Sequence, residues 1–312
     1  MEFVIELLSA TMRLATPIAL AAMGAAVCER SGIVNIAMEG LMLIGAFFAA
    51  AIALATGSPW LGLLGGIVFG GLFSLLHAWS TVTLHINHTV SGAIINILAA
   101  GLTRFFMVQF YGHPGSSDMV EKTLGDINCA VPLLSKIPLL GPVLFDQSPT
   151  VYFMYFFVFF TTFLLKKTKL GLHIRAAGEH PMALETLGIS VKKIRYIGVL
   201  YSGLLCGFAG SFLAIEYGRF FTEGMTGGRG FIALAANVSG GWTAIGSFIA
   251  ALFFGFIDAL QLKLQVMDAF NIPPEIFHML PYVATVIAVA GLVKKSRPPA
   301  DSGNDFSIEK EI

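Results

Sequence analysis

The sequence has little charge. Asp, Glu, Lys and Arg make up 12% of its 312 residues, whereas soluble domains usually carry about 25%. Hydrophobic residues reach 56%, the mean hydropathy is +0.79 and the formal net charge is zero. A soluble protein this apolar could not cover its surface with polar groups, and a neutral chain lacks the basic surface that nucleic acid requires. The composition therefore indicates a membrane protein and argues against a nucleic-acid partner.

Cysteine is also scarce. The chain has three cysteines, Cys28, Cys129 and Cys206, and none of them forms a C-x-x-C pair. This excludes a disulfide framework and favours the interpretation of Cys28 and Cys206, which lie in apolar runs, as small packing residues. His, Asp and Glu show no clear ligand spacing, so we assign no metal, and we interpret His85 and His88 as polar anchors near an interface.

Catalytic signatures are missing. The pattern G-x-x-x-x-G-K-[ST], which holds the phosphates of ATP, occurs nowhere in the chain. No combination of nucleophile and base stands out, which argues against an intramembrane enzyme and leaves no catalytic residue to propose. The N-terminal run MEFVIELLSATMRL has acidic residues where a signal peptide needs basic ones, so we expect it in the mature protein.

What the sequence does contain is long apolar segments. They fall at about 3–27, 36–57, 60–83, 91–110, 150–165, 196–215, 229–241, 243–262 and 277–293. We predict an all-α, polytopic membrane bundle of about 8–10 transmembrane helices, because a span needs roughly 20 residues and lipid forbids unpaired backbone groups. Broken or re-entrant segments are expected, since 229–241 is too short to cross. The 34 glycines crowd these segments, which is typical of close helix packing, with sliding surfaces as the functional alternative.

Lysine and arginine are concentrated at two places. The residues are Lys166, Lys167, Lys169, Lys192, Lys193 and Arg195 around the polar stretch 166–195, and Lys294, Lys295 and Arg297 after the last apolar segment. Basic loops stay in the cytoplasm, so we predict a cytoplasmic loop at 166–195 and an external loop at 111–149, while the side of the N-terminus stays open. We divide the chain into one transmembrane domain, 1–297, and a disordered cytoplasmic tail, 298–312.

The stretch 166–195 predicts a short helix between Pro181, which suits a first helical position, and Gly188, which suits an exit. So short a helix is marginal alone, and Met182, Leu184 and Leu187 could offer an apolar contact face. Its acidic residues, Glu179 and Glu185, favour docking on a protein over docking on lipid headgroups. The alternative is a loop that only anchors the chain.

Two segments, 28–50 and 218–241, interrupt the apolar pattern with glycine and polar residues. A charge at the bilayer centre costs about 2.5–3.5 kcal/mol, so these residues face protein, water or an interface. The first segment is either an interfacial turn with a Glu29–Arg30 pair or a broken helix whose polar groups line a path, and a matching break in the second half favours the path. The side chains expected along it are Asn35, Glu39, Asn96, Glu223, Arg229 and Asn237.

Four stretches carry a family resemblance. They are ERSGIVNIAMEG (29–40), VSGAIIN (90–96), GLHIRAAGEHPMALETLGI (171–189) and GGRGFIALAANVSGGW (227–242). With them, in this order, the sequence resembles a permease subunit of bacterial or archaeal ABC importers, in the ribose/branched-chain amino acid permease superfamily and its nucleoside/simple-sugar branch. Residues 240–242 depart from the pattern, because many relatives have a bulkier or charged residue before the tryptophan.

The resemblance implies that the loop 171–190 is a coupling helix seated in a cytosolic ABC ATPase subunit, which would use the ATP while this chain binds no cofactor. The residues with a mechanical role there would be Arg175, Glu179, Ala183, Thr186 and Gly188. It also implies a second permease subunit, identical or different, and an extracellular solute-binding protein that docks near 111–149 and 263–275.

The same resemblance places the chain, with several spans, among the lipids of a plasma (inner) membrane of a bacterium or archaeon. It implies alternating access for purine nucleosides first, then simple sugars such as ribose, then branched-chain amino acids. The alternative class is a secondary transporter or channel that needs no ATPase, for which Asp258 is the one deep acid of the later helices.

Overall fold

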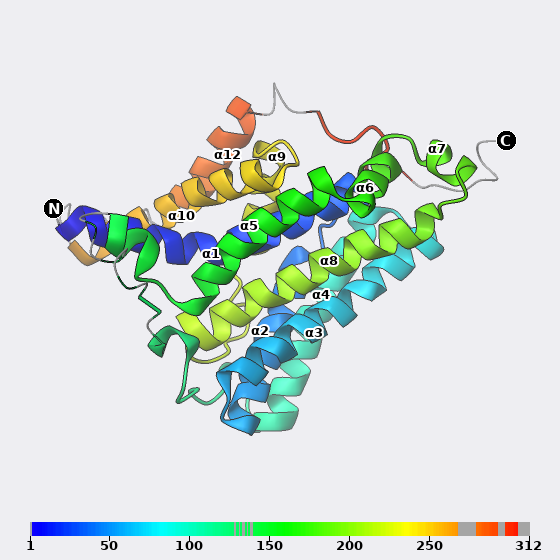
Figure 1. Cartoon of the computed structure of the whole chain (residues 1–312). Helices are drawn as coiled ribbons and strands as arrows, with labels where there is room; N and C mark the ends of the chain where they lie inside the picture. The colour runs from blue at the N-terminus through cyan, green and yellow to red at the C-terminus, as the bar shows by residue number, and fades with distance from the viewer. Residues whose placement is uncertain are drawn as a thin grey trace.

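The structure of the chain, a computed structural model, describes residues 2–127, 140–267, 279–292 and 297–304, with 129, 130, 132, 135 and 137 in addition. Its helices are α1 (Glu2–Arg30), α2 (Met38–Thr56), α3 (Pro59–Ala78) continued by η1 (Trp79–Thr83), α4 (His88–Tyr111), η2 (Leu124–Asp126), η4 (Gly141–Phe145), α5 (Pro149–Lys167), α6 (Lys169–Glu179), α7 (Pro181–Thr186), α8 (Val191–Phe212) continued by η5 (Leu213–Tyr217), α9 (Arg229–Ser239), α10 (Ala244–Met267) and α12 (Leu280–Leu292) (Figure 1). Some predictions concern Lys294, Lys295 and residues 268–278 and 305–312, which lie outside the described residues.

The prediction of an all-α, polytopic membrane bundle is confirmed. Seven helices of the described part are long and apolar enough to cross a membrane: α1, α2, α3 with η1, α4, α5, α8 with η5, and α10. Each coincides with a predicted apolar segment. The α9 helix has 11 residues and cannot cross, as expected for 229–241. The one extended pairing between described residues is an isolated bridge of Ser116 with Thr222.

Glycine brings α2, α3 and α8 into close contact. Gly66 and Gly70 of α3 lie against Gly203 and Gly207 of α8, and a Cβ atom on Gly207 would collide with the Gly66 carbonyl oxygen. Without side chains at these positions the backbones can approach each other, which is how small residues stabilise helix pairs in membranes. The close packing of α3 against α8 therefore accounts for the glycine runs of these two helices.

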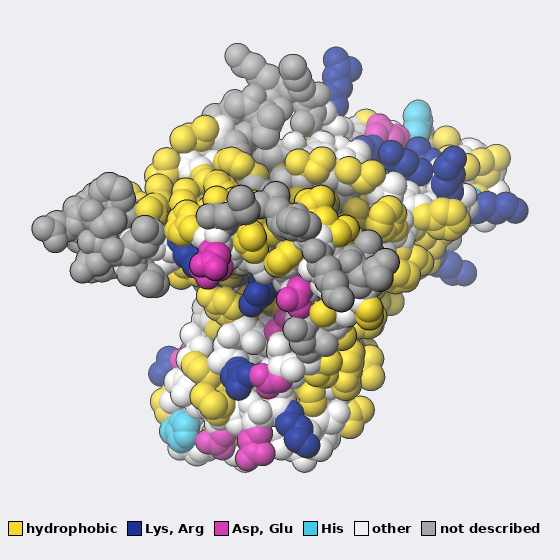
Figure 2. Space-filling model, turned by 60° about the vertical axis from the view of Figure 1, so that its left-hand side comes forward, with side chains coloured by type: hydrophobic (Ala, Val, Ile, Leu, Met, Phe, Trp, Pro, Cys, Tyr) yellow, Lys and Arg dark blue, Asp and Glu magenta, His cyan; other side chains and the backbone are white. Residues whose placement is uncertain are grey.

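The α1 helix runs through the interior, between α8 and α10 (Figure 1). Its second half is buried without interruption from Ile18 to Cys28. Cys206 of α8 is likewise fully buried, so both cysteines that lie in apolar runs pack as predicted. Large apolar side chains such as Ile97 of α4 and Phe159 of α5 instead face outward and are 73% and 77% exposed. Figure 2 shows, in yellow, that apolar side chains cover much of the face in view, and such a surface suits lipid or a second subunit.

The molecule has a basic end and an opposite end, separated by the roughly 36 Å length of α4. The basic end comprises α6, α7 and the first turns of α4 and α8, and Lys and Arg gather over it at the upper right of Figure 2. The opposite end comprises the last turn of α4, the segment after it and the turn at Gly57. By the positive-inside rule the basic end corresponds to the predicted cytoplasmic side.

The segment 300–304 lies against the basic end, although the sequence predicts disorder from residue 298 because the tail is polar. The Asp301 N–H donates to the Gly178 carbonyl (2.8 Å), and the Gly303 N–H donates to the Gly32 carbonyl (3.0 Å). The Asp301 carboxylate also pairs with Arg195. Hydrogen bonds rather than apolar burial hold this part of the tail, so its composition gives no sign of order.

Candidate functional site

The first break, residues 31–37, separates α1 from α2 and is closed by two side-chain amides. Asn35 donates from Nδ2 to the Ser202 hydroxyl (2.9 Å) and accepts from the Ala37 N–H (3.1 Å). Asn96 of α4 accepts from the Gly40 N–H (2.8 Å) and donates to the Ile36 carbonyl (2.9 Å). The backbone N–H and C=O groups that lack helical hydrogen bonds thus find partners inside the bundle, which is what non-helical backbone within a membrane requires.

The two charges before this break do not pair with each other as the interfacial-turn interpretation proposes. Glu29 accepts a hydrogen bond from the indole N–H of Trp242 (2.5 Å). Arg30 donates from Nε to the Trp242 carbonyl (2.9 Å) and lies 3.8 Å from the Glu179 carboxylate. Both residues therefore fix the end of α1 to the turn after α9, where Trp242 has a positive φ of 54°.

The second break, residues 218–228, leads from η5 to α9. The first N–H groups of a helix have no acceptor within the helix, and Gly228 at the start of α9 has no side chain that could provide one. The Glu39 carboxylate of α2 provides two acceptors: Oε1 accepts from the Gly228 N–H (2.8 Å) and Oε2 accepts from the Gly230 N–H (2.7 Å). A carboxylate at a helix N-terminus is also favoured by the helix dipole.

The two breaks approach from opposite ends and meet inside the bundle. The first begins beside His88, at the basic end of α4, while the second begins beside Ser116, at the opposite end. The start of α2 lies beside Asn96, eight residues along α4, which is roughly 12 Å from its first turn. Since the hydrocarbon layer is about 30 Å thick, the Glu39 junction lies within it.

The remaining predicted path residues lie elsewhere. Asn237 is fully buried towards the basic end, and its side-chain oxygen accepts from the Ser247 hydroxyl (3.3 Å). Glu223 is exposed at the opposite end and accepts from the Gly115 N–H (3.1 Å). The structure therefore brings Asn35, Glu39 and Asn96 to the first break, with Arg229 beside the Glu39 junction.

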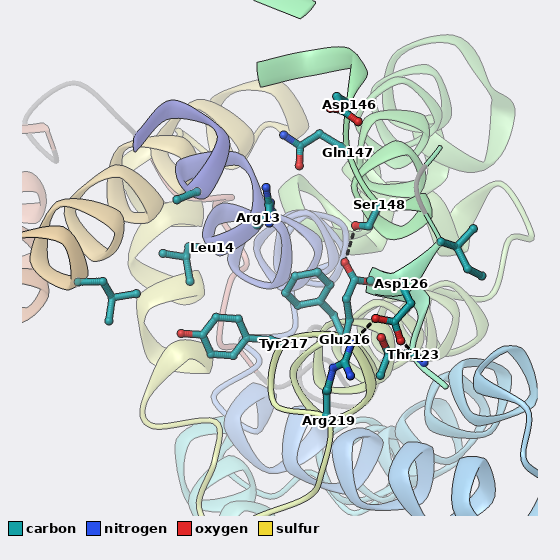
Figure 3. A pocket seen from close by; sticks show the side chains of 15 residues that line it. Arg13, Leu14, Thr123, Asp126, Asp146, Gln147, Ser148, Glu216, Tyr217 and Arg219 are labelled. Carbon is teal, nitrogen blue, oxygen red and sulfur yellow. Dashed lines mark hydrogen bonds and ion pairs between the residues drawn. The ribbon is translucent and has the colours of Figure 1, made fainter. Parts of the chain in front are cut away.

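An outer cavity of about 520 Å³ opens near the opposite end, and Figure 3 shows it from close by. Its walls come from α1, the segment around η2, the start of α5, η5 and α10. The lining residues that carry polar groups or aromatic rings are Arg13, Thr123, Asp126, Asp146, Gln147, Ser148, Phe212, Glu216, Tyr217 and Arg219. Its volume falls in the range of small-molecule sites, about 300–1,000 Å³.

Two carboxylates of this cavity, Glu216 and Asp126, interact with neighbouring side chains. Glu216 accepts hydrogen bonds from the hydroxyl groups of Ser148 and Thr150, and Asp126 pairs with Arg219. Hydrogen bonds from the side chain and backbone of Thr123, with Arg219 nearby, hold the pKa of Asp126 below its usual value, so its carboxylate is ionised at neutral pH.

A second, deeper cavity of about 330 Å³ shares Leu14, Tyr217 and Leu262 with the first. It is also lined by Arg229 and Asp258, so the two cavities lead from the opposite end towards the Glu39 junction. Of the six predicted path residues, Arg229 alone lines either of these two cavities.

Each cavity has at least one wall residue with a buried side-chain atom that no other described residue satisfies. In the outer cavity the side-chain oxygen of Gln147 is such an atom, and in the deeper one Nε of Arg229 is another. Buried polar atoms are normally hydrogen-bonded, so the Gln147 oxygen is a candidate acceptor and the Arg229 nitrogen a candidate donor for a ligand.

Sequence reasoning missed the outer cavity. One of its acids, Glu216, follows an apolar run directly and is followed by Tyr217 and Arg219, a pattern that marks the end of a span as much as a site. The partners Ser148 and Asp126 lie 68 and 93 residues away from Glu216 and Arg219. Only the fold brings them together.

The basic end presents a compact helical surface formed by α6, α7 and the turn to α8. Ala183, Thr186 and Gly188 are exposed there, as is Glu179, while Arg175 is half-buried. Leu187 protrudes with 75% of its surface exposed. All five residues that the family resemblance assigns to coupling therefore lie on or beside one surface.

The interior of this surface is packed and capped. Leu184, predicted as part of the contact face, is 3% exposed and packs with Ile174 and Val191, because the amphipathic α7 turns it inward. Gly188 adopts φ 75° and ends α7 with hydrogen bonds from its own N–H and that of the next residue back to the helix. Glu185 accepts from the Val191 N–H (2.8 Å) at the start of α8, which joins the two helices.

A protein-family model, described as the branched-chain amino acid transport system / permease component, matches residues 7–289. The chain belongs to this family. The family and the seven apolar helices among the described residues make it a multi-pass permease of the plasma membrane.

The relatives of this permease extend along nearly its whole length. It is 40% identical to the guanosine ABC transporter permease protein NupQ of Bacillus subtilis, over 94% of each chain. It is 38% identical to the nucleoside ABC transporter permease protein NupC of Lactococcus lactis, over 95% of this chain and 94% of that one. A putative glucose ABC transporter permease protein of Haloferax volcanii, TsgC13, is 33% identical over 93% and 92%.

A solved structure shares the fold. It is the inward-facing conformation of a putative metal-chelate type ABC transporter, with a TM-score of 0.51 and 15% identity over 92% of this chain and 85% of that one. At this identity the likeness concerns the arrangement of the helices.

Proposed function

We propose that the chain is the membrane-spanning permease subunit of an ATP-driven ABC importer whose cargo is a purine nucleoside. The observation that carries this is similarity over nearly the full length to permeases described as serving guanosine and nucleosides. Simple sugars are the second candidate, because a relative described as a putative glucose permease is 33% identical.

The route of the cargo runs through the outer cavity and the deeper one towards the Glu39 junction. Phe212 and Tyr217 offer ring faces on which a base can stack, as aromatic side chains do with nucleobases. The open acceptor of Gln147 suits a ribose hydroxyl, and the open donor of Arg229 suits a base carbonyl. Passage then requires the junction of α2 with α9 to open, which is alternating access at a broken-helix site.

ATP is used by a separate cytosolic subunit that docks on α6 and α7, and this chain binds no cofactor itself. Leu187 provides the exposed apolar contact, with Ala183 and Thr186 beside it. The exposed apolar faces of the spans take lipid and a second permease subunit, the same chain or a different one. An external solute-binding protein delivers the cargo at the opposite end, on the loop 111–149.

The cargo is tested by uptake into cells that express the complete transporter. We expect labelled guanosine to accumulate, unlabelled adenosine to compete, and ribose, glucose and leucine to leave uptake unchanged. Competition by a sugar and not by any nucleoside would replace the first candidate with the second. Uptake that persists after ATP depletion would instead point to a secondary transporter.

The coupling surface is tested by Leu187→Glu, with Met119→Glu as the matched control. Both side chains are exposed, by 75% and 63%, but Met119 lies at the opposite end. We expect Leu187→Glu to release the ATPase during purification and to abolish uptake, because a charge replaces the apolar contact, whereas the control keeps the ATPase bound. Equal retention of the ATPase by the two variants would contradict docking on α7.

A further inference from the structure

The segment 300–304 touches three separate elements of the basic end. Its backbone N–H groups bond to the carbonyl groups of Gly178, at the end of α6, and Gly32, at the start of the first break. Arg195, in the first turns of α8, donates to the Asp301 carboxylate (2.5 Å) and to the Asn304 carbonyl (3.2 Å). Five residues near the C-terminus thus join α6, α8 and the α1–α2 connection.

The arginine of the ion pair at the centre of this contact is buried, and the aspartate is partly exposed. The side chain of Arg195 is 3% exposed and that of Asp301 is 19% exposed. Removing Asp301 would leave a buried guanidinium without its counter-charge, which is strongly unfavourable.

The pair is also built into the first break. Gly32 adopts φ 97°, and a side chain there would meet the guanidinium of Arg195. The Gly32 carbonyl accepts from Gly303, so Arg195 packs on one side of this glycine while the tail is bonded to it. The first break and the tail therefore share one rigid contact.

This contact completes a continuous path. The α7 surface packs on α6, α6 is bonded to the tail, and the tail is bonded to Gly32. Seven residues beyond Gly32, Glu39 caps α9 at the junction of the two breaks. The steps along the path are hydrogen bonds, packed helices and, from Gly32 to Glu39, the chain of the first break itself.

We infer that residues 300–304 form a strap, with Asp301 as a positioning residue, that transmits displacement of α6 to the first break and through Glu39 to α9. The inference rests on the proposed function, because the displacement comes from the ATPase that docks on α7. A direct contact of α6 with α1 also exists, through Glu179 and Arg30. Loss of the strap therefore weakens the coupling without abolishing it.

Two truncations of the complete transporter test the strap. A stop after Pro298 removes all of its contacts, whereas a stop after Asn304 removes only residues 305–312 and serves as the control. We expect the shorter chain to transport roughly fivefold less guanosine per ATP hydrolysed, the lower end of usual coupling energies, and the longer chain to match the wild type. The ratio is the decisive measurement, because a merely structural role would lower protein amount and melting temperature while leaving it unchanged.

The variant Asp301→Asn decides the matter if the shorter chain fails to reach the membrane, since it removes a charge and leaves the chain length intact. We expect a smaller loss of the same ratio. An unchanged ratio in the shorter chain or in Asp301→Asn overturns the inference, and so does an equal loss in both truncations. Absence of ATP-driven uptake in the wild type would instead overturn the proposed function, and the coupling role of the strap with it.

Discussion

The two breaks differ in how they are held. The first, at 31–37, is closed by amides from its own residues and from α4, all within the bundle. The second, at 218–228, contains many glycines, and its inner end is held by a carboxylate from α2. The first break is therefore held by contacts with α4 and α8, while the inner end of the second break depends on α2, the helix that follows the first break. We expect α9 to move whenever α2 moves.

The largest expected effect comes from Glu39→Ala, which removes both caps of α9. Two hydrogen bonds to a charged group disappear, so we expect a destabilisation of roughly 3 kcal/mol and uptake at background level. Thermal melting of the purified complex and guanosine uptake measure the two quantities. Glu39→Gln retains an acceptor and should keep part of both. Normal uptake by Glu39→Ala would show that the second break does not depend on the first.

A smaller effect is expected from Asn96→Ala. The Gly40 N–H and the Ile36 carbonyl lose a partner inside the bundle, which we expect to cost about 2 kcal/mol. Uptake per molecule should fall less than with Glu39→Ala, because the cap of α9 stays. The melting temperature and the amount of protein in the membrane report the loss.

Asn87 provides the matched control for Asn96. It caps the start of α4 by accepting from Thr89 and Val90, but it is exposed. Asn87→Ala should cost about 1 kcal/mol, since water can satisfy the freed groups. If Asn87→Ala lowers the melting temperature as much as Asn96→Ala does, the buried contacts of Asn96 at the first break contribute no more to stability than an exposed helix cap.

The smallest effect is expected from Glu223→Gln, at the outer end of the second break. Its ion pair with Arg104 has a separation of 4.0 Å with the arginine 69% exposed, so the charge should contribute less than about 0.5 kcal/mol. Uptake and melting temperature should stay at wild-type values. A loss comparable to that of Glu39→Ala would mean that the second break is fixed from outside rather than from α2.

The long spans and the place of both breaks were predictable from the sequence, because apolar runs and charges are local signals. The closing contacts were not. Asn96 lies 56 residues from its partner Gly40, and Glu39 lies 189 residues from Gly228. Glu39 and Asn96 were expected along the path of a cargo. Both bond to backbone groups at helix starts in this structure, because leaving a backbone N–H without a partner inside the bundle is costly.

The family resemblance indicated which segment forms the surface of the basic end, but not which side chains of that segment are buried. Leu184 and Leu187 both looked like contact residues, and only the turn of α7 separates the buried one from the exposed one. The outer cavity stayed hidden because its residues, such as Glu216 and Ser148, come from distant segments and form no motif.

The bond between Arg195 and Asp301 has a consequence for biosynthesis. Ribosomes make a chain from its first residue to its last, so Asp301 becomes available after α6, α8 and Gly32 have all been made. A product released early, at any codon between 293 and 299, contains every helix that the structure describes and still lacks this bond. Synthesis of Asp301, rather than insertion of α12, is therefore the step after which this bond at the basic end can form.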